Sequence, residues 1–160
     1  QNAQNVYAVP DTVFEAFRQK FPTARTFHLN TVLLQQFHAL ADEEDFKFFL
    51  NVREQYLQVF LFKGKKLLFN NAFRFRSSKD FVYFVLLVFD QFKLKPENVP
   101  TIFSGQLIED SEVYNLVNRY VPTLQRIAVK NFFTFHEQFH AQSQQPHFYF
   151  DAYALEQYEE

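Results

Sequence analysis

The chain has 160 residues, enough for one domain, or one domain with a smaller piece attached, but too few for two domains of full size. With 24 Phe, 2 Gly and no Cys, it excludes a disulfide framework, a thiolate metal site and a cysteine nucleophile, and a reducing compartment such as the cytoplasm fits best. The net charge is −2 with Lys and Arg scattered along the chain, which argues against a nucleic-acid partner.

The longest apolar run, residues 81–89, lies between Asp80 and Asp90 and is far shorter than the ~20 residues that cross a bilayer. It predicts a core helix and no transmembrane segment. The chain opens Gln-Asn-Ala-Gln-Asn, without an initiator Met, a basic leader or an apolar signal stretch, so we expect a trimmed or internal fragment.

The first part of the chain predicts two short strands, each followed by a helix. Residues 6–9 favour a strand, and Pro10 stands at the first turn of a helix that ends at Pro22. The apolar side of this helix is formed by Val13, Phe14, Phe17 and Phe21. Residues 25–29 favour a second strand, and a helix follows over 31–41. The acidic run 42–45 is then a solvated linker.

Three strands are expected next, over residues 46–52, 56–62 and 67–75. Lys63-Gly64-Lys65 is typical of a hairpin turn, whereas the joint at 53–55 lacks glycine and should use ordinary backbone angles. The third run shows its arginines to water, as an edge strand does.

Ser77-Ser78 is typical of a helix cap, and the apolar spacing predicts a helix running to about Phe92. Its other side is apolar too, so we expect cover on nearly all sides, including by a neighbouring domain. A buried strand is expected over 99–104, with Gly105 as a turn, and then a helix capped by Asp110 that ends at Pro122. A strand over 125–129 and a short helix over 150–157 complete the prediction, and 131–147 is ambiguous.

The order of elements after residue 45 is strand, strand, strand, helix, strand, helix, strand, a feasible mixed α/β sheet. This order resembles one lobe of the actin, sugar-kinase and Hsp70 superfamily, with its ribonuclease H-like fold. The segments FNNAFRF (69–75), DFVYFVLLVFDQ (80–91) and IFSG (102–105) resemble an uncharacterised family of Bacteroidetes proteins with an actin-like ATPase fold. The chain is also distantly similar to the actin-like assembly proteins of type IV pili.

The resemblance covers roughly residues 6–129 and matches the second half of a longer family member. It implies three parts. Residues 1–42 are the remnant of a first lobe with a connecting helix, 43–130 an actin-like second lobe, and 131–160 a C-terminal extension. Because the shared segments are packing patterns, they imply fold more directly than activity.

Actin-like ATPases hold nucleotide between two lobes, and the resemblance implies where the second lobe would bind it. Asn51 stands where the phosphate hairpin has an acidic residue, and Arg53 where it has a glycine. The adenosine loop is reduced to Ser104-Gly105-Gln106, and the first-lobe phosphate loop is not visible in the sequence. An amide cannot act as a carboxylate base, so hydrolysis is not expected. Two readings remain: these residues contact an adenosine or another anion, or Gly105 only permits a sharp turn while Arg53 is solvated.

His136-Glu137-Gln-Phe-His140 matches H-E-x-x-H, which on a helix places two imidazoles for zinc and a glutamate for general-base work. The third ligand is the difficulty, because Ser143 and Pro146 stand where the extended motif has glycine and histidine. His147 is one position late, and Glu156 or Glu159 could serve instead. In an extended chain the two histidines would lose their helical relation. The alternatives are a zinc-dependent hydrolase and a chance match.

We expect a non-catalytic actin-fold scaffold or interaction module with a degenerate nucleotide site and a protein partner or a homo-oligomer. The alternatives are a residual ATP-binding protein and the zinc hydrolase. No cofactor is expected, with Mg-ATP as the exception to test. Lys63, Lys65 and Lys66 at the hairpin could attract an acidic partner or a membrane surface, or could simply be solvated.

Overall fold

The computed structural model describes residues 5–129 and 145–158. The strands are β1 (Phe46–Arg53), β2 (Tyr56–Lys63), β3 (Lys66–Arg74), β4 (Thr101–Gly105) and β5 (Leu124–Arg126). The helices are α1 (Asp11–Lys20), α2 (Leu29–Leu40), α3 (Ser78–Gln91), α4 (Glu112–Tyr120) and α6 (Phe150–Glu156), with 3-10 helices η1 (Pro96–Asn98) and η3 (Pro146–Tyr149).

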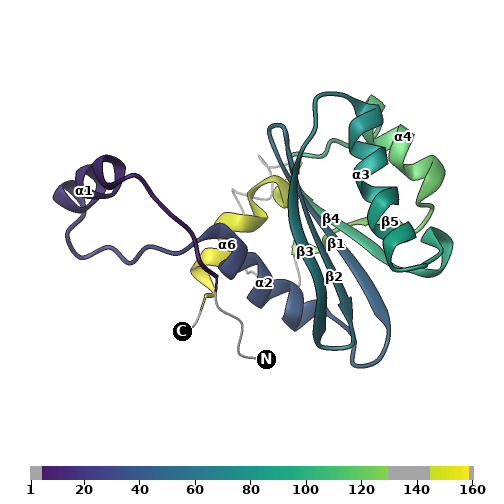
Figure 1. The fold of residues 1–160 in the computed structure, drawn as a ribbon, viewed down its shortest axis with the longest axis horizontal. Helices are drawn as coiled ribbons and strands as arrows, with labels where there is room; N and C mark the ends of the chain where they lie inside the picture. Colours follow the sequence, from purple (N-terminus) through teal and green to yellow (C-terminus); the bar gives the residue numbers. More distant parts are fainter. Residues whose placement is uncertain (1–4, 130–144, 159–160) are drawn as a thin grey trace.

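The strands form one five-stranded mixed sheet in the order β3-β2-β1-β4-β5. The first three strands pair antiparallel through tight hairpins, whereas β4 pairs parallel with β1 and β5 parallel with β4. Helices α3 and α4 cover one face of the sheet, and α2 and α6 cover the other (Figure 1). The predicted order of elements and the predicted α/β mixed sheet are confirmed, and β3 is an edge strand as expected.

Two aromatic cores follow from the alternation of side chains along β1. Phe48 faces α3 and stacks on Phe89 with ring centroids 4.5 Å apart. Its neighbour Phe49 points to the opposite face and stacks on Phe37 of α2 at 4.6 Å. Helices cover both faces of the sheet, so the side chains on both faces of β1 and β2 are buried. These two strands are therefore apolar almost throughout.

Residues 5–27, which we call the N-terminal arm, extend away from the sheet and carry α1 at their far end (Figure 1). The predicted helix is confirmed, with Pro10 at its N-cap position. The strands predicted over 6–9 and 25–29 are wrong: the first segment has no regular structure, and Leu29 already belongs to α2. A strand needs a neighbour for its backbone groups, and the arm lies apart from the sheet that could supply one.

Two local predictions fail at left-handed residues. The turn after β1 does not use ordinary angles, because Glu54 has φ +50° and its N–H donates to the Oε1 of Gln106 at 2.9 Å. A two-residue hairpin needs positive φ to match the twist of its strands, and here the chain meets that need without glycine. Asp110 has φ +66° and does not cap α4. The cap is Ser111, whose hydroxyl accepts from the N–H of Tyr114.

Helix α3 is not covered on all sides by the described residues. Its inner side is buried, but Tyr83 is 60% exposed and Leu87 is 39% exposed on the outer side. The predicted last strand is also shorter than expected, since β5 ends at Arg126. In the described part of the chain, no helix is long and apolar enough to span a membrane.

Candidate functional site

The residues that the resemblance assigned to nucleotide binding come together at the ends of β1 and β4. These strands run parallel side by side, so Asn51 lies opposite Ser104 and Val52 lies opposite Gly105. The carboxyl ends of neighbouring parallel strands are the usual place for a ligand in an α/β sheet. The residues named from the resemblance are therefore neighbours at the ends of these strands, and what they can do chemically depends on what their side chains contact.

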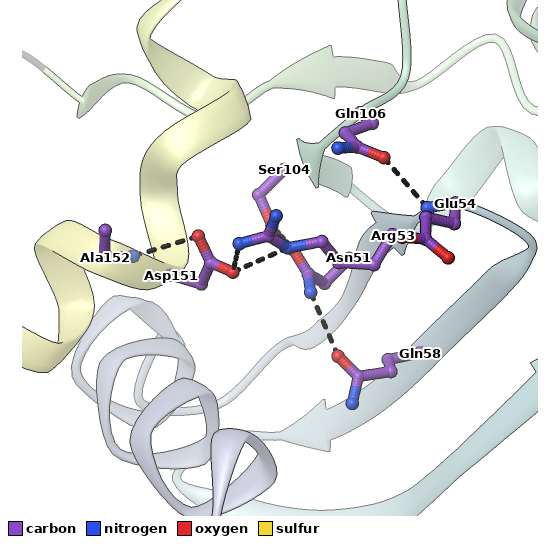
Figure 2. Close-up of polar contacts among 8 residues, drawn as sticks. All are labelled: Asn51, Arg53, Glu54, Gln58, Ser104, Gln106, Asp151 and Ala152. Carbon is purple, nitrogen blue, oxygen red and sulfur yellow. Dashed lines mark hydrogen bonds and ion pairs between the residues drawn. The ribbon is translucent and has the colours of Figure 1, made fainter. Parts of the chain in front are cut away.

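Asn51 is 1% exposed and both ends of its amide are occupied. Its Nδ2 donates to Oε1 of Gln58 on β2 at 3.0 Å, and its Oδ1 accepts from the hydroxyl of Ser104 at 3.0 Å (Figure 2). Gln58 in turn donates to Oδ1 of Asn30 on α2 at 2.7 Å. A chain of neutral amides and one hydroxyl thus runs from β4 across the sheet to α2, and its buried members satisfy one another.

Gly105 is required by the packing of the two strands. Its φ is +78°, and a Cβ built there would lie 2.2 Å from the carbonyl oxygen of Val52 and 2.9 Å from Oδ1 of Asn51. The same Val52 carbonyl accepts from the N–H of Gln106 at 2.7 Å. The space that a glycine leaves for a phosphate in a nucleotide loop is here taken by the neighbouring strand.

Arg53 is held by a carboxylate from the C-terminal helix. Its Nε donates to Oδ2 of Asp151 at 2.7 Å, and Nη2 contacts the same oxygen (Figure 2). Asp151 is 8% exposed, and its other oxygen accepts from the N–H of Ala152 at 2.9 Å. Arg53 is therefore more than a solvated side chain: it is 43% exposed, and the charge-assisted pair also holds its guanidinium against α6.

Asp151 is the site residue that sequence reasoning missed. It lies in the first turn of α6 between two residues whose positions point to the core, Phe150 and Ala154. One feature of the sequence could have indicated it: Asp151 lies on the apolar side of a short helix, and a buried carboxylate rarely lacks a cationic partner. Its partner is 98 residues earlier, so spacing along the chain could not name it.

His147 belongs to no cluster of three metal-binding side chains among the described residues. It is buried, its Nε2 lies 3.1 Å from the carbonyl oxygen of Leu107, and its ring packs edge-on against Phe103. Burial lowers the pKa of His147 from its ordinary value, so the neutral ring is favoured. With Nε2 protonated, the ring donates to Leu107.

The zinc prediction falls outside the described residues. His136, Glu137 and His140 lie between the two described segments, as does Ser143, and Glu159 lies beyond the second. Within residues 5–129 and 145–158 no three His, Cys, Asp or Glu side chains gather in a way that could hold a metal ion. Glu156 is exposed at the end of α6.

The chemistry of the described site is limited by these contacts. Asn51 has no proton-accepting carboxylate to offer, and the buried carboxylate of Asp151 is neutralised by Arg53 (Figure 2). Ser104 donates its hydroxyl proton to Asn51 and has no base beside it among the labelled residues. The arrangement joins three strands to two helices through polar contacts.

The charged hairpin at Lys63–Lys66 is more than a solvated tip. Lys65 donates to the carbonyl oxygen of Ala41 at 2.7 Å and to those of His38 and Ala39 at 3.3 Å, so it caps the C-terminal end of α2. Gly64 allows the hairpin to approach the backbone that follows α2, since a Cβ at this position would lie 2.3 Å from the carbonyl oxygen of Glu43. This hairpin therefore fixes the end of α2 against the sheet.

Comparison with solved structures gives a likeness in fold. A crystal structure from Bacteroides thetaiotaomicron, described as a protein with actin-like ATPase fold and unknown function, matches with a TM-score of 0.75 at 19% sequence identity. The match covers 94% of this chain and 52% of the other, so this chain spans about half the length of that protein. The fold is thus the actin-like ATPase fold, as the resemblance implied.

A comparison with curated proteins gives no match. A family described as "Protein of unknown function (DUF3822)" matches residues 1–124, which include the arm, the sheet as far as the start of β5, and helices α1 to α4. The expectation of an uncharacterised family with an actin-like fold is confirmed. The chain belongs to the DUF3822 family.

Proposed function

We propose that this chain is a non-catalytic actin-fold module that acts through protein contacts, as a scaffold or assembly partner. The observation that carries the proposal is that the polar groups at the ends of β1 and β4 are occupied by one another and by Asp151. A nucleotide phosphate arriving there would meet an amide with both ends engaged and a guanidinium already paired.

The energetic balance supports this reading. Nε and Nη2 of Arg53 are already bound to Asp151, which is nearly buried, so a phosphate could use these donors only by displacing that carboxylate. Leaving a buried polar group without its partner costs about 1–3 kcal/mol, and more when the group is charged. A new phosphate contact to the same guanidinium gains a similar amount, so the exchange yields little net affinity.

The exposed apolar side chains support the interaction half of the proposal. Tyr83 and Leu87 are open on the outer side of α3, and the arm exposes several more. Contiguous exposed apolar surface on a folded domain commonly marks a contact with another protein. These surfaces lie away from the closed site, so the chain can bind a partner without using the ends of β1 and β4.

The test is a thermal unfolding series with Mg-ATP, paired with calorimetric titration. A ligand present at a thousand times its dissociation constant stabilises the folded state by about 4 kcal/mol, an easily measured rise in Tm. We expect no rise and no binding heat at 1–2 mM, which is roughly that excess for a micromolar ligand. Micromolar binding would overturn the proposal and favour a residual ATP-binding protein.

The variant Asn51→Asp tests whether the site can hydrolyse ATP. It places a carboxylate where an actin-like ATPase would use one, while Arg53 and Asp151 remain in place. We expect neither the wild type nor this variant to release phosphate from ATP. Turnover by the wild type, abolished in Ser104→Ala or Arg53→Ala, would show that the site works despite its internal contacts.

A further inference from the structure

The N-terminal arm, residues 5–27, has an apolar surface that the rest of the described chain leaves open. All its residues are exposed except the half-buried Phe14 and Phe27. Val13 on α1 is 59% exposed and Phe17 is 40% exposed. Between α1 and the two extended segments of the arm lies a groove of about 480 Å³, lined mainly by apolar side chains from Tyr7 to Phe27.

The charges on α1 are divided between its two halves, with Asp11 and Glu15 in the first and Arg18 and Lys20 in the second. Asp11 and Arg18 are seven residues apart, which is close to two full turns, so they lie on the same side of the helix. Arg18 also lies over the ring of Phe14, with its Cζ 4.8 Å from the ring centroid, which places it at the border of the apolar face. The acidic end and the basic end of α1 therefore share one edge.

This pattern is complementary to itself when the helix is reversed. In an antiparallel pair of identical helices related by a two-fold axis, equivalent edges face each other in opposite directions. Asp11 then lies beside Arg18 of the partner subunit, and Arg18 lies beside the partner's Asp11. A parallel pair would instead bring like charges together at both positions.

We propose that two copies of this chain associate through their arms, with the α1 helices antiparallel and Val13 and Phe17 of each packed in the apolar groove of the other. The inference rests on the proposed role as an interaction module and names the partner of that role. The surface is isologous, so a single contact closes the assembly as a dimer.

Another occupant is a lobe like the unmatched half of the Bacteroides thetaiotaomicron protein, of which this chain spans 52%. Such a lobe would cover the arm without requiring self-complementary charges. The two occupants differ in what the isolated chain does in solution. A second copy gives a dimer, whereas a separate lobe leaves the chain monomeric.

The first experiment is the mass of the 160-residue chain by light scattering and sedimentation over a range of concentrations. We expect a dimer for the wild type and a monomer for Phe17→Asp, which places a charge in the apolar contact. Ile108→Asp is the matched control, because Ile108 is 49% exposed outside the arm, and it should remain dimeric. A monomeric wild type overturns the proposal.

The second experiment tests the orientation with two charge reversals. Asp11→Arg gives a chain with basic residues at both positions, and Arg18→Asp one with acidic residues at both. Each alone should weaken self-association roughly tenfold, because two attractive pairs become repulsive. An equimolar mixture of the two should dimerise, because position 11 of each chain then carries the charge opposite to position 18 of its partner. Self-association of each variant at wild-type strength, or a mixture no stronger than its components, overturns the antiparallel arrangement.

Circular dichroism shows whether each variant is folded, and the exposed positions make unfolding an improbable cause of dissociation. The nucleotide titration is independent of all these results. A monomeric chain that binds no nucleotide removes the dimer and leaves the non-catalytic role standing. A dimer that binds Mg-ATP at micromolar concentration supports the association of two copies and overturns the proposed function.

Discussion

Arg53 at the end of β1 is paired with Asp151 on α6, although the two residues lie 98 positions apart in the chain. The pair attaches the C-terminal helix to the sheet at the position where the resemblance implied the glycine of a phosphate hairpin. The same contact closes the site and holds the second core layer, so changes in it should be visible in stability as well as in binding.

Replacing Asp151 with Ala should lower the free energy of unfolding by about 1–3 kcal/mol, because Arg53 loses a charge-assisted partner and α6 its anchor. Urea denaturation followed by circular dichroism measures this. Glu156→Ala in the same helix is the control, since an exposed end residue should change stability by less than about 0.5 kcal/mol. Equal effects of the two variants would show that the pair adds nothing to the fold.

Gly105→Ala should destabilise the chain by about 1–3 kcal/mol, since it forces a side chain to positive φ and against the Val52 carbonyl. The neighbouring Gln106→Ala loses one hydrogen bond to the N–H of Glu54 and should cost no more than about 1 kcal/mol. The midpoints of urea unfolding compare the two. An unchanged midpoint for Gly105→Ala would mean that the glycine is not needed for packing.

Glu54→Gly should stabilise the chain by a few tenths to about 1 kcal/mol, because a non-glycine residue at φ +50° is strained. Gln55→Gly is the matched control: Gln55 is not among the positive-φ residues, so glycine there adds freedom to the unfolded chain, removes the hydrogen bond from Arg74 to the Gln55 side chain, and should destabilise the fold. The prediction fails if both changes lower the unfolding midpoint equally.

Through His147, stability should fall as the pH drops below about 6.5, the ordinary pKa of histidine. Its pKa is lowered in the folded state, chiefly by burial, with Arg126 lowering it further and the Leu107 carbonyl and Glu109 raising it. The unfolded chain therefore binds the proton first, so the stabilising contribution is full above the ordinary histidine pKa of about 6.5 and is lost as pH falls toward the folded value.

The measurement is the urea midpoint at pH 7.5 and pH 5.5 for the wild type and His147→Phe. The variant keeps an aromatic ring in the space beside Phe103 but has no titrating group, so its midpoint should change less between the two pH values. The other four histidines of the sequence, His28, His38, His136 and His140, are the same in both proteins and cancel in the comparison. The same pH dependence in both would assign the effect to other groups.

The sheet and its helices were predictable because their signals are local. Alternating phenylalanines specified the strands, Ser77 marked the start of α3, and the succession of elements indicated a mixed sheet through the rules of chain connection. The choice of Asn51, Ser104 and Gly105 came instead from the resemblance to actin-like ATPases, and the register of β1 and β4 places them side by side.

What escaped prediction depends on distant or absent neighbours. Residues 6–9 have the composition of a strand, but a strand requires another segment for its backbone, which the sheet of this chain does not give them. Asp151 required knowledge of which side of a short helix meets Arg53. The left-handed turn at Glu54 required the side chain of Gln106, contributed from the end of another strand.

The chain of amides from Ser104 through Asn51 and Gln58 to Asn30 has a consequence for how the sheet chooses its alignment. Strands with phenylalanine and leucine on both faces could slide past one another by one position with little loss of apolar contact. Such a slide would turn Asn51 into the phenylalanine-rich layer beneath α3 and strip it of partners. These uncharged hydrogen bonds thus make one register of β1 with β2 and β4 lower in free energy than the registers shifted by one residue. The sheet is therefore expected to form in that single register.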